Sequence, residues 1–215
     1  MKTTIKELES VCFALSKPSK MPCHSYNTST TGCRVGSTLV NVPGSVCFGC
    51  YAMKGRYRFP KGEQARMKRL NAIRNNLGEW EKAITELIKR KEKSGFFRWH
   101  DAGDILHLEH LESINRIAIA LPKIKFWLPT RELSTVAEFA MKHGKFADNL
   151  TVRLSALKVN GIAPAAVAKR LGVNTSTVGW KNSKHVCPAS TQGNECKDCR
   201  ACWQSNVANV DYPFH

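Results

Sequence analysis

The stretch FFRWHDAGD at Phe96–Asp104 decides the fold of this chain. Its first five residues are rich in aromatic side chains and predict a short buried strand. A polar loop follows at once, and Gly103 permits a tight turn there. A helical pattern then begins near His107 and ends before Pro122. A strand followed by a helix is the repeating unit of a parallel α/β sheet.

The same unit recurs along the chain, with a helix predicted at 134–143 after the next strand. Two further helices are predicted upstream, over 63–76 and 79–93. Strands are predicted at Phe96–His100, Lys125–Leu128, Asn149–Ala156 and Thr177–Trp180. We therefore expect a compact α/β fold, a partial (β/α) barrel-like parallel sheet with cysteine-rich metal-binding segments. In such folds the active site lies at the C-terminal ends of the strands.

The 215 residues suit one domain with a sizeable core. We expect a loop-rich, cysteine-containing segment at 1–60, an α/β core at 95–182 and a metal-binding tail with four cysteines at 183–215. Glu7 and Glu9 precede any apolar run, so the N-terminus is not a secretory signal. No apolar stretch reaches membrane-spanning length. The expected location is the cytoplasm, without a membrane partner, and the oligomeric state stays open.

The charge is strongly positive, with 33 Lys and Arg against 17 Asp and Glu, a formal net charge of +16. Such a charge indicates a polyanionic partner, and DNA or another nucleic acid is the first candidate. The segment 51–74 interleaves aromatic and basic side chains, so cations can hold phosphates while rings stack on bases. The alternative is a solvated basic helix face. The residues expected to bind nucleic acid are Lys54, Arg56, Tyr57, Arg58, Arg66, Lys68 and Arg69.

Nine cysteines, an odd number, in a chain without an export signal favour metal ligation over disulfides. The strongest local signal is the run Cys187-x8-Cys196-x2-Cys199-x2-Cys202, which suits a structural Zn²⁺ or, alternatively, a 4Fe–4S cluster. A second set comprises Cys33, Cys47 and Cys50. These three predict an iron–sulfur cluster with one open iron, or a zinc site completed by Cys23 or His24. Whether the two sets form two metal sites or one stays open.

The loop after Phe96–His100 places Asp101 and Asp104 at a strand end. Two close carboxylates can divide nucleophilic and acid–base roles, because each shifts the pKa of the other. The alternative is a turn whose aspartates cap the next helix. The strand-end rule points to Asp101 and Asp104, and also to Arg131, Glu132 and Ser155. Arg131, Glu132 and the loop residue His100 are expected to bind substrate.

A further pattern competes for 165–181, AAVAKRLGVNTSTVGWK. Ala168, Gly172 and Val178 have the spacing of a helix-turn-helix, whose second helix would enter the major groove of DNA. The same residues also fit a barrel helix followed by a strand. The first interpretation predicts a zinc-stabilised DNA-binding regulator.

Five stretches are similar to a family of small phage-encoded proteins: GSVCFGCYAMKGRYRFP, FRWHDAGD, FWLPTRE, NLTVRLSA and CPASTQGNECKDCRACW. Their order resembles that of the guanine transglycosylases that insert 7-deazaguanine bases into DNA. An Asp-rich loop after an early barrel strand, a Leu-Pro-Thr-Arg run and a cysteine-rich zinc site occur in both. That family's nucleophilic aspartate lies just before its Leu-Pro-Thr-Arg run, where this chain has Lys125 and Phe126.

This resemblance implies a DNA base-modifying enzyme, a glycosyltransferase of the TIM barrel-like kind. It would exchange guanine for a preQ0-like 7-deazaguanine base through a covalent intermediate on Asp101 or Asp104. Arg131, Glu132 and Arg153 would read the base, and the zinc would be structural.

A second resemblance is to radical S-adenosylmethionine enzymes. Cys33, Cys47 and Cys50 would stand for their cluster cysteines, and Ala102–Asp104 is similar to their Gly-Gly-Glu loop after the second strand. The gap from Cys33 to Cys47 is longer than that superfamily's spacing. This resemblance implies an iron–sulfur enzyme acting on nucleic acid, with an auxiliary cluster on the C-terminal cysteines.

Overall fold

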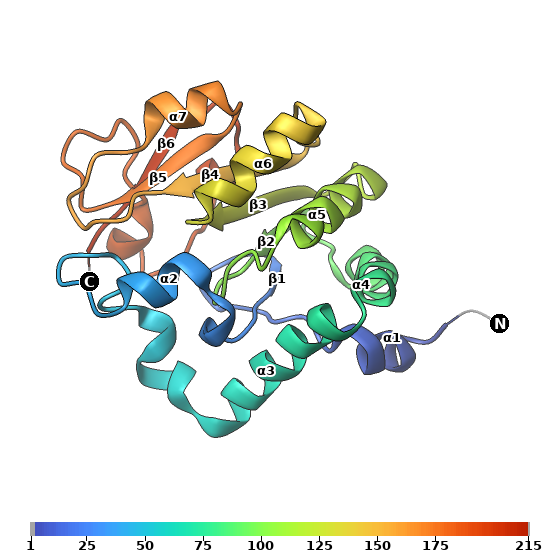
Figure 1. The fold of residues 1–215 in the computed structure, drawn as a ribbon. Coiled ribbons are helices and arrows are strands. Elements are labelled where there is room, and N and C mark those ends of the chain that lie inside the picture. Colours follow the sequence, from blue (N-terminus) through green and yellow to red (C-terminus); the bar gives the residue numbers. More distant parts are fainter. Residues whose placement is uncertain (1–2, 215) are drawn as a thin grey trace.

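The computed structural model describes residues 3–214, apart from the side chain of Arg56. Its centre is a six-stranded sheet in which every neighbouring pair is parallel and the strands follow chain order (Figure 1). This is the strand order of a (β/α) barrel that stops before closure. The strands are β1 (His24–Tyr26), β2 (Phe96–Trp99), β3 (Lys125–Thr130), β4 (Leu150–Ser155), β5 (Asn174–Val178) and β6 (Asn209–Tyr212).

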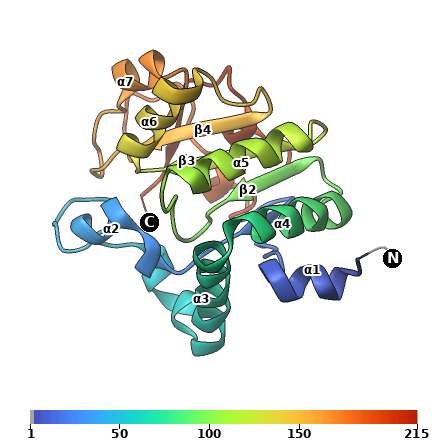
Figure 2. The ribbon, with the colours of Figure 1, turned by 45° about the vertical axis from the view of Figure 1, so that its right-hand side comes forward.

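Helices connect successive strands from β2 to β5, and the helices α4, α5 and α6 lie side by side along the sheet (Figure 2). Parallel strands in chain order require each connecting helix to cross on the same side of the sheet. The helices are α1 (Ile5–Cys12), α2 (Arg34–Leu39), α3 (Pro60–Asn75), α4 (Leu77–Lys91), α5 (Leu108–Ala120), α6 (Leu133–His143) and α7 (Ala165–Arg170). Among the described residues, no helix has the length and apolar composition needed to cross a membrane.

Local sequence explains where the long helices begin. Pro60 occupies the first turn of α3, where its missing N–H costs nothing. Asn76 separates α3 from α4, and its side-chain oxygen accepts a hydrogen bond from the Glu79 N–H at 3.1 Å. Gly95, with φ of 78°, provides the turn that leads into β2.

The two faces of the sheet bury different cores. On the helix-covered face, Phe97 and Trp99 of β2 join Phe126, Leu128 and the helices in the larger core. Successive side chains of a strand point to opposite faces, so alternate residues enter this core when both faces are buried.

On the opposite face, a smaller core forms around Trp127, Trp203 and Val210. The segment that carries Trp203 precedes β6 and lies against the sheet, with the indole N–H donating to the Phe97 carbonyl at 2.8 Å. The C-terminal segment therefore covers the face that further barrel strands would otherwise enclose.

Three of the four predicted strands form within a residue or two of their expected bounds, and the fourth lies earlier, at Asn174–Val178. Two strands were not predicted. β1 has three residues and β6 has four, and neither is long enough to show a clear period. The parallel sheet therefore extends into both the segment expected to be loop-rich and the C-terminal tail.

The helix-turn-helix interpretation is wrong. α7 ends at Arg170, and the residues that would form the recognition helix are strand β5, paired with β4 and β6. Val173 to Val178 is rich in β-branched side chains, which favour a strand. The alternative of a barrel helix followed by a strand is confirmed.

Ile84 tests the larger core. Its side chain is fully buried in α4, so Ile84→Ala should lower the free energy of unfolding by about 2–5 kcal/mol. Met141→Ala, at a side chain that is 80% exposed, should change it by less than about 0.5 kcal/mol. Urea denaturation followed by circular dichroism measures both values, and equal losses in the two variants would contradict this core.

Candidate functional site

Cys33, Cys47 and Cys50 come from the connection between β1 and β2 and lie close to one another. A Cβ atom built on Gly36 would lie 3.8 Å from the sulfur of Cys33 and 3.8 Å from that of Cys47, so the two sulfurs are at most twice that distance apart. Burial raises the pKa of both thiols, and the nearby Arg131 opposes this rise. Cys33 and Cys47 are thus close in space although thirteen residues separate them in the sequence.

Glu132 holds the Cys33 segment against the end of β3. Its buried carboxylate accepts hydrogen bonds from the backbone N–H groups of Arg34 at 3.2 Å and Val35 at 2.9 Å. These are the first residues of α2, and Cys33 is the residue immediately before them. A carboxylate satisfies the free N–H groups of a first helical turn. Glu132, which the sequence indicated as substrate-binding, therefore positions Cys33.

Asp101 and Asp104 lie at the end of β2, as expected, but both carboxylates are buried and engaged. Asp101 accepts hydrogen bonds from the side chains of Ser25, Asn27 and Tyr57. Every carboxylate oxygen of this residue already has a partner.

Asp104 accepts hydrogen bonds from the backbone N–H groups of Ile105 and Arg131 and from the Thr130 hydroxyl. Burial nevertheless raises its pKa. This aspartate joins the end of β2 to the end of β3, which is a structural arrangement.

His100 is buried beside these aspartates in an unusual backbone conformation. Its φ is 53°, and neither ring nitrogen has a hydrogen-bond partner among the described residues. Burial lowers the pKa of the imidazole to about 4, so the ring is neutral at pH 7. A neutral, unpartnered imidazole at a strand end fits the expected substrate-binding position.

Arg131 lines a cavity of about 440 Å³ at the ends of β3 and β4. Val35, Leu157, Ile162 and Lys158 also line it, so its wall is mostly apolar with two cations. The guanidinium Nε has no partner among the described residues. A mostly apolar cavity with a few polar groups is the usual form of a small-molecule site.

Arg153 is fully buried, and all five of its N–H donors are used. They bond to the backbone carbonyls of Ala201, Cys202, Gln204, Val207 and Thr175. No donor is left for a base, which corrects the expectation that Arg153 reads the substrate. Its guanidinium instead holds the C-terminal cysteine segment against β4.

The C-terminal cysteines form a second group on the opposite face of the sheet. Cys187, Cys196, Cys199 and Cys202 pack against the smaller core together with Cys23. His24, the other ligand suggested for the first set, instead pairs with Glu92 at 2.9 Å. The cysteines thus divide into two groups, and Cys23 belongs with the second.

All nine cysteines are free of disulfides. No three of the described His, Cys, Asp and Glu side chains are arranged to hold a metal ion. The metal-binding roles expected for the seven cysteines therefore stay predictions.

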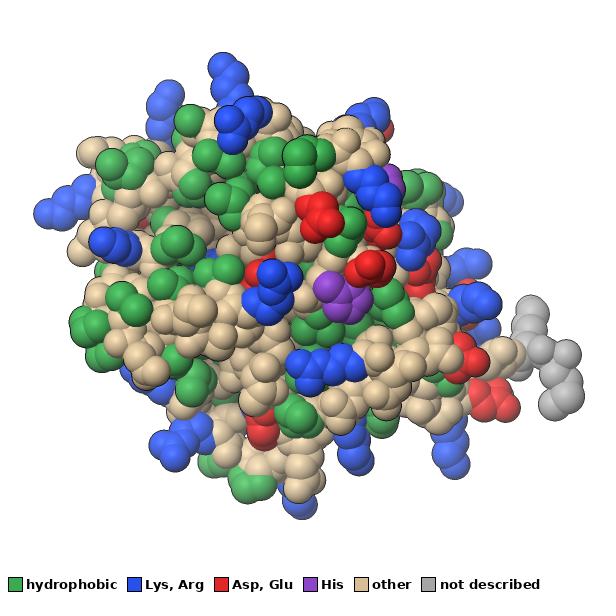
Figure 3. Space-filling view, viewed as in Figure 1, with side chains coloured by type: hydrophobic (Ala, Val, Ile, Leu, Met, Phe, Trp, Pro, Cys, Tyr) green, Lys and Arg blue, Asp and Glu red, His purple; other side chains and the backbone are tan. Residues whose placement is uncertain are grey.

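Only some of the basic side chains in the segment 51–74 are exposed to solvent. Lys54, Arg58 and Lys68 are exposed, whereas Arg66 and Arg69 are buried. Arg66 pairs with Glu63 at 2.7 Å. Figure 3 shows basic side chains spread over this face and interspersed with hydrophobic ones.

Arg69 donates to the Ala14 carbonyl and to Asn27, so it joins Arg66 in having a structural role that the sequence did not indicate. The Tyr57 hydroxyl bonds to Asp101. The side chain of Arg56 lies outside the described residues.

The fold and site define a parallel α/β protein with two cysteine groups, one at the C-terminal edge of the sheet and one beneath its open face. The chain belongs to the family Gene product 88, whose model matches residues 2–205. This is a phage-type family, which agrees with the resemblance to small phage proteins, and its name states no activity. No curated protein and no solved structure matches the chain.

His100 should make the protein less stable in acid. Its pKa is about 4 when folded and near 6.5 when unfolded, so the unfolded chain binds the proton more readily between these values. The resulting stability is present above pH 6.5 and is lost as the pH falls toward 4. Relative to His100→Asn, which tolerates a positive φ, the wild type should lose about 2 kcal/mol more between pH 7 and pH 5. Urea titrations at both pH values measure this, and parallel losses would refute it.

Asp104→Asn should destabilise the fold by about 1–3 kcal/mol, because an amide group replaces an oxygen that accepts from backbone N–H groups. Asp148→Asn, at a side chain that is 93% exposed, should be nearly neutral. Urea denaturation of both variants checks this. An Asp104→Asn protein with unchanged stability that had lost base exchange in DNA would instead support a nucleophilic Asp104.

Proposed function

We propose that the chain is an iron–sulfur enzyme of the radical S-adenosylmethionine type that modifies nucleic acid. The observation that carries this proposal is the proximity of Cys33, Cys47 and Cys50 beside the C-terminal edge of a six-stranded parallel sheet in chain order. That edge is where sheets of this kind place their reactions.

The donor set of this first group is Cys33, Cys47 and Cys50, and three thiols suit a cluster that keeps one iron open for S-adenosylmethionine. A four-iron cluster spreads its cysteine ligands over different irons, and three cysteines leave one iron open. Burial keeps the thiols of Cys33 and Cys47 protonated until a metal displaces the proton.

The surrounding residues have distinct tasks in this proposal. Glu132 holds the segment that carries Cys33, and Asp104 ties the ends of β2 and β3 together. The cavity beside Arg131 would take S-adenosylmethionine, with the guanidinium available to its carboxylate and with Ile162 and Leu157 as apolar lining. When bound, the cluster supplies an electron to S-adenosylmethionine for radical chemistry on the substrate.

The nucleic acid would approach over the cysteine loop. Phe48, Tyr51 and Phe59 are each more than half exposed there, and they alternate with Lys54 and Arg58. Exposed rings stack on unpaired bases while cations hold phosphates. The net charge of +16 favours the same partner.

The C-terminal group would hold a second, structural metal, either Zn²⁺ or a further cluster. Arg153 bonds the backbone around Cys202 and so presents this group to the sheet. Four thiolates would complete the coordination of a single ion and leave no open position.

The geometry does not favour a guanine transglycosylase. That reaction needs a carboxylate free to attack the sugar. Both oxygens of Asp101 and both oxygens of Asp104 already accept hydrogen bonds. The 7-deazaguanine base and structural zinc that belong to that mechanism have no independent support.

Cysteine variants test the proposal. Protein purified without oxygen should contain iron and sulfide and show a broad visible band. Replacing Cys33, Cys47 or Cys50 by alanine should remove this iron and abolish reductive cleavage of S-adenosylmethionine. Cys12→Ala is the matched control, because Cys12 is buried and its thiol only donates to the Leu8 carbonyl.

Two outcomes would overturn the proposal. One is protein that contains zinc alone and has no visible band. The other is iron that survives loss of Cys33, Cys47 and Cys50 but disappears with Cys196→Ala, because the catalytic centre would then not be at the sheet edge.

A further inference from the structure

Arg98 and Arg153 lie on the face of the sheet that carries the smaller core, and only Arg153 has a hydrogen-bond partner for every donor. Arg153 of β4 uses all five donors on backbone carbonyls. Arg98 of β2 lies deep in the molecule, and part of its side chain remains reachable by solvent. Its Nε has no accessible surface and no hydrogen-bond partner.

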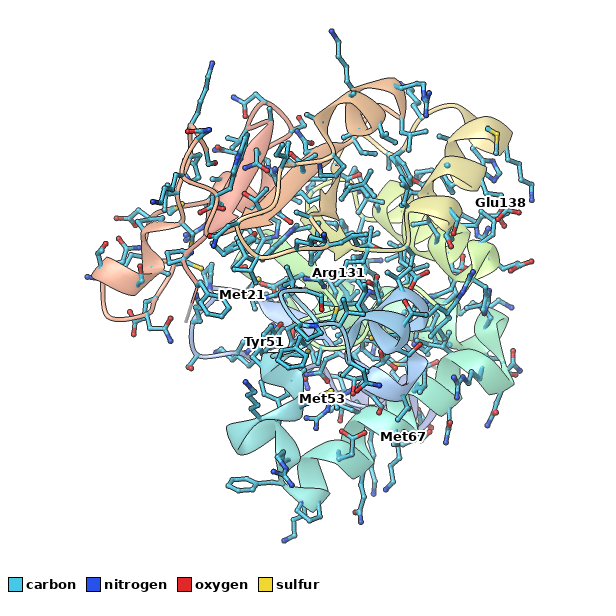
Figure 4. The ribbon with its side chains drawn as sticks, turned by 60° about the vertical axis from the view of Figure 1, so that its left-hand side comes forward. Met21, Tyr51, Met53, Met67, Arg131 and Glu138 are labelled. Carbon is cyan, nitrogen blue, oxygen red and sulfur yellow. The ribbon has the colours of Figure 1, made fainter. Side chains whose placement is uncertain are left out.

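The remaining contacts of Arg98 are weak. Its guanidinium lies over the ring of Trp127 at 4.4 Å. One terminal nitrogen approaches the sulfur of Met21 at 3.7 Å and the other the hydroxyl oxygen of Tyr51 at 3.4 Å. Met21 and Tyr51 also appear close together in Figure 4. A thioether is a poor acceptor, so the guanidinium has most of its hydrogen-bonding capacity free.

No described carboxylate forms an ion pair with Arg98. The closest candidate, Asp101, already accepts three hydrogen bonds from other side chains. The charge of Asp101 raises the pKa of Arg98 without bonding to it. A partly buried cation is thus left with most of its donors free, which is costly for the protein.

We propose that Arg98 anchors an oxyanion subsite that binds a phosphate or carboxylate group of a ligand. A guanidinium supported by an aromatic ring keeps its planar edge available for two parallel hydrogen bonds to such a group. The indole N–H of Trp127, the ring that supports the guanidinium, is also buried without a partner.

The subsite lies between the two cysteine groups. Tyr51, which touches Arg98, directly follows Cys50 in the chain. On the other side, burial raises the pKa of Cys202 to about 12 and the charge of Arg98 opposes that rise. The inference rests on the arginine's own contacts and holds whether or not the cysteines carry a metal.

A stability comparison forms the first part of the test, using the full-length protein in chloride buffer. Arg98→Met should leave Tm unchanged or raise it, because the variant removes a partly buried charge that forms no ion pair with a described carboxylate. Arg153→Met, the matched control on the same face, should lower Tm because it leaves five carbonyls without their donor. A loss in Arg98→Met as large as that in Arg153→Met, or failure of Arg98→Met to fold, would overturn the proposal.

An anion titration forms the second part. Inorganic phosphate and acetate are added separately at constant ionic strength, and the Nε–Hε resonance of Arg98 is followed by NMR. One of the two should shift this resonance saturably and raise Tm by about 3 °C at ten times its Kd. The anion that saturates distinguishes a phosphate ligand from a carboxylate ligand.

Two arginine variants show whether the rise in Tm comes from anion binding at Arg98. Arg98→Gln should abolish the rise in Tm, whereas Arg116→Gln, at a surface arginine paired with Glu81, should keep it. An equal rise in wild type and Arg98→Gln would show that the anion binds elsewhere on this basic protein. That result, or an Arg98 resonance unmoved by both anions, would refute the subsite.

Discussion

A parallel sheet must be covered on both faces, and this requirement governs the rest of the molecule. Helices α4 to α7 accompany the strands on one face, where Phe97, Trp99 and Phe126 enter the larger core. The chain has six strands in barrel order and does not close. The opposite face is instead covered by the segment around Trp203, and the end of the sheet carries the long β1–β2 connection. Both covering segments are cysteine-rich, so the residues proposed to bind metals also belong to the segments that cover the sheet.

Buried charge distinguishes structural residues from functional ones in this protein. Glu132 and Arg153 are fully buried. Glu132 Oε1 accepts from two backbone N–H groups and Arg153 donates to five backbone carbonyls, so each fixes a cysteine-bearing segment. Arg98 lies in β2 and Arg131 follows β3, but their Nε atoms lack partners among the described residues. A polar group withdrawn from water is stable only when it is paired, and unpaired ones indicate where a ligand would bind. The two unsatisfied arginines lie near the two cysteine groups, so both proposed ligand sites fall in this region.

The sequence alone predicted much of the sheet because β2, β3 and β4 are rich in aromatic or aliphatic side chains and are bounded by turns and helices. β1 (HSY) and β6 (NVDY) are short and largely polar, so they carry too little apolar pattern to be recognised. The cysteine spacing within the C-terminal segment predicted a local group, because residues a few positions apart cannot lie far apart. In contrast, the roles assigned to Arg66, Arg69 and Arg153 failed, since residue type indicates charge but not burial.

The sequence by itself determined the alternation of strands and helices, the basic charge and the position of Asp101 and Asp104 at a strand end. These follow from local periodicity and composition. Only the tertiary structure decided that both aspartates are fully hydrogen-bonded, that Cys33 meets Cys47 and that Cys23 joins the C-terminal group. These facts depend on contacts between residues distant in the chain. Hydrogen-bond satisfaction and burial are properties of the packed molecule, and no local pattern of residues specifies them.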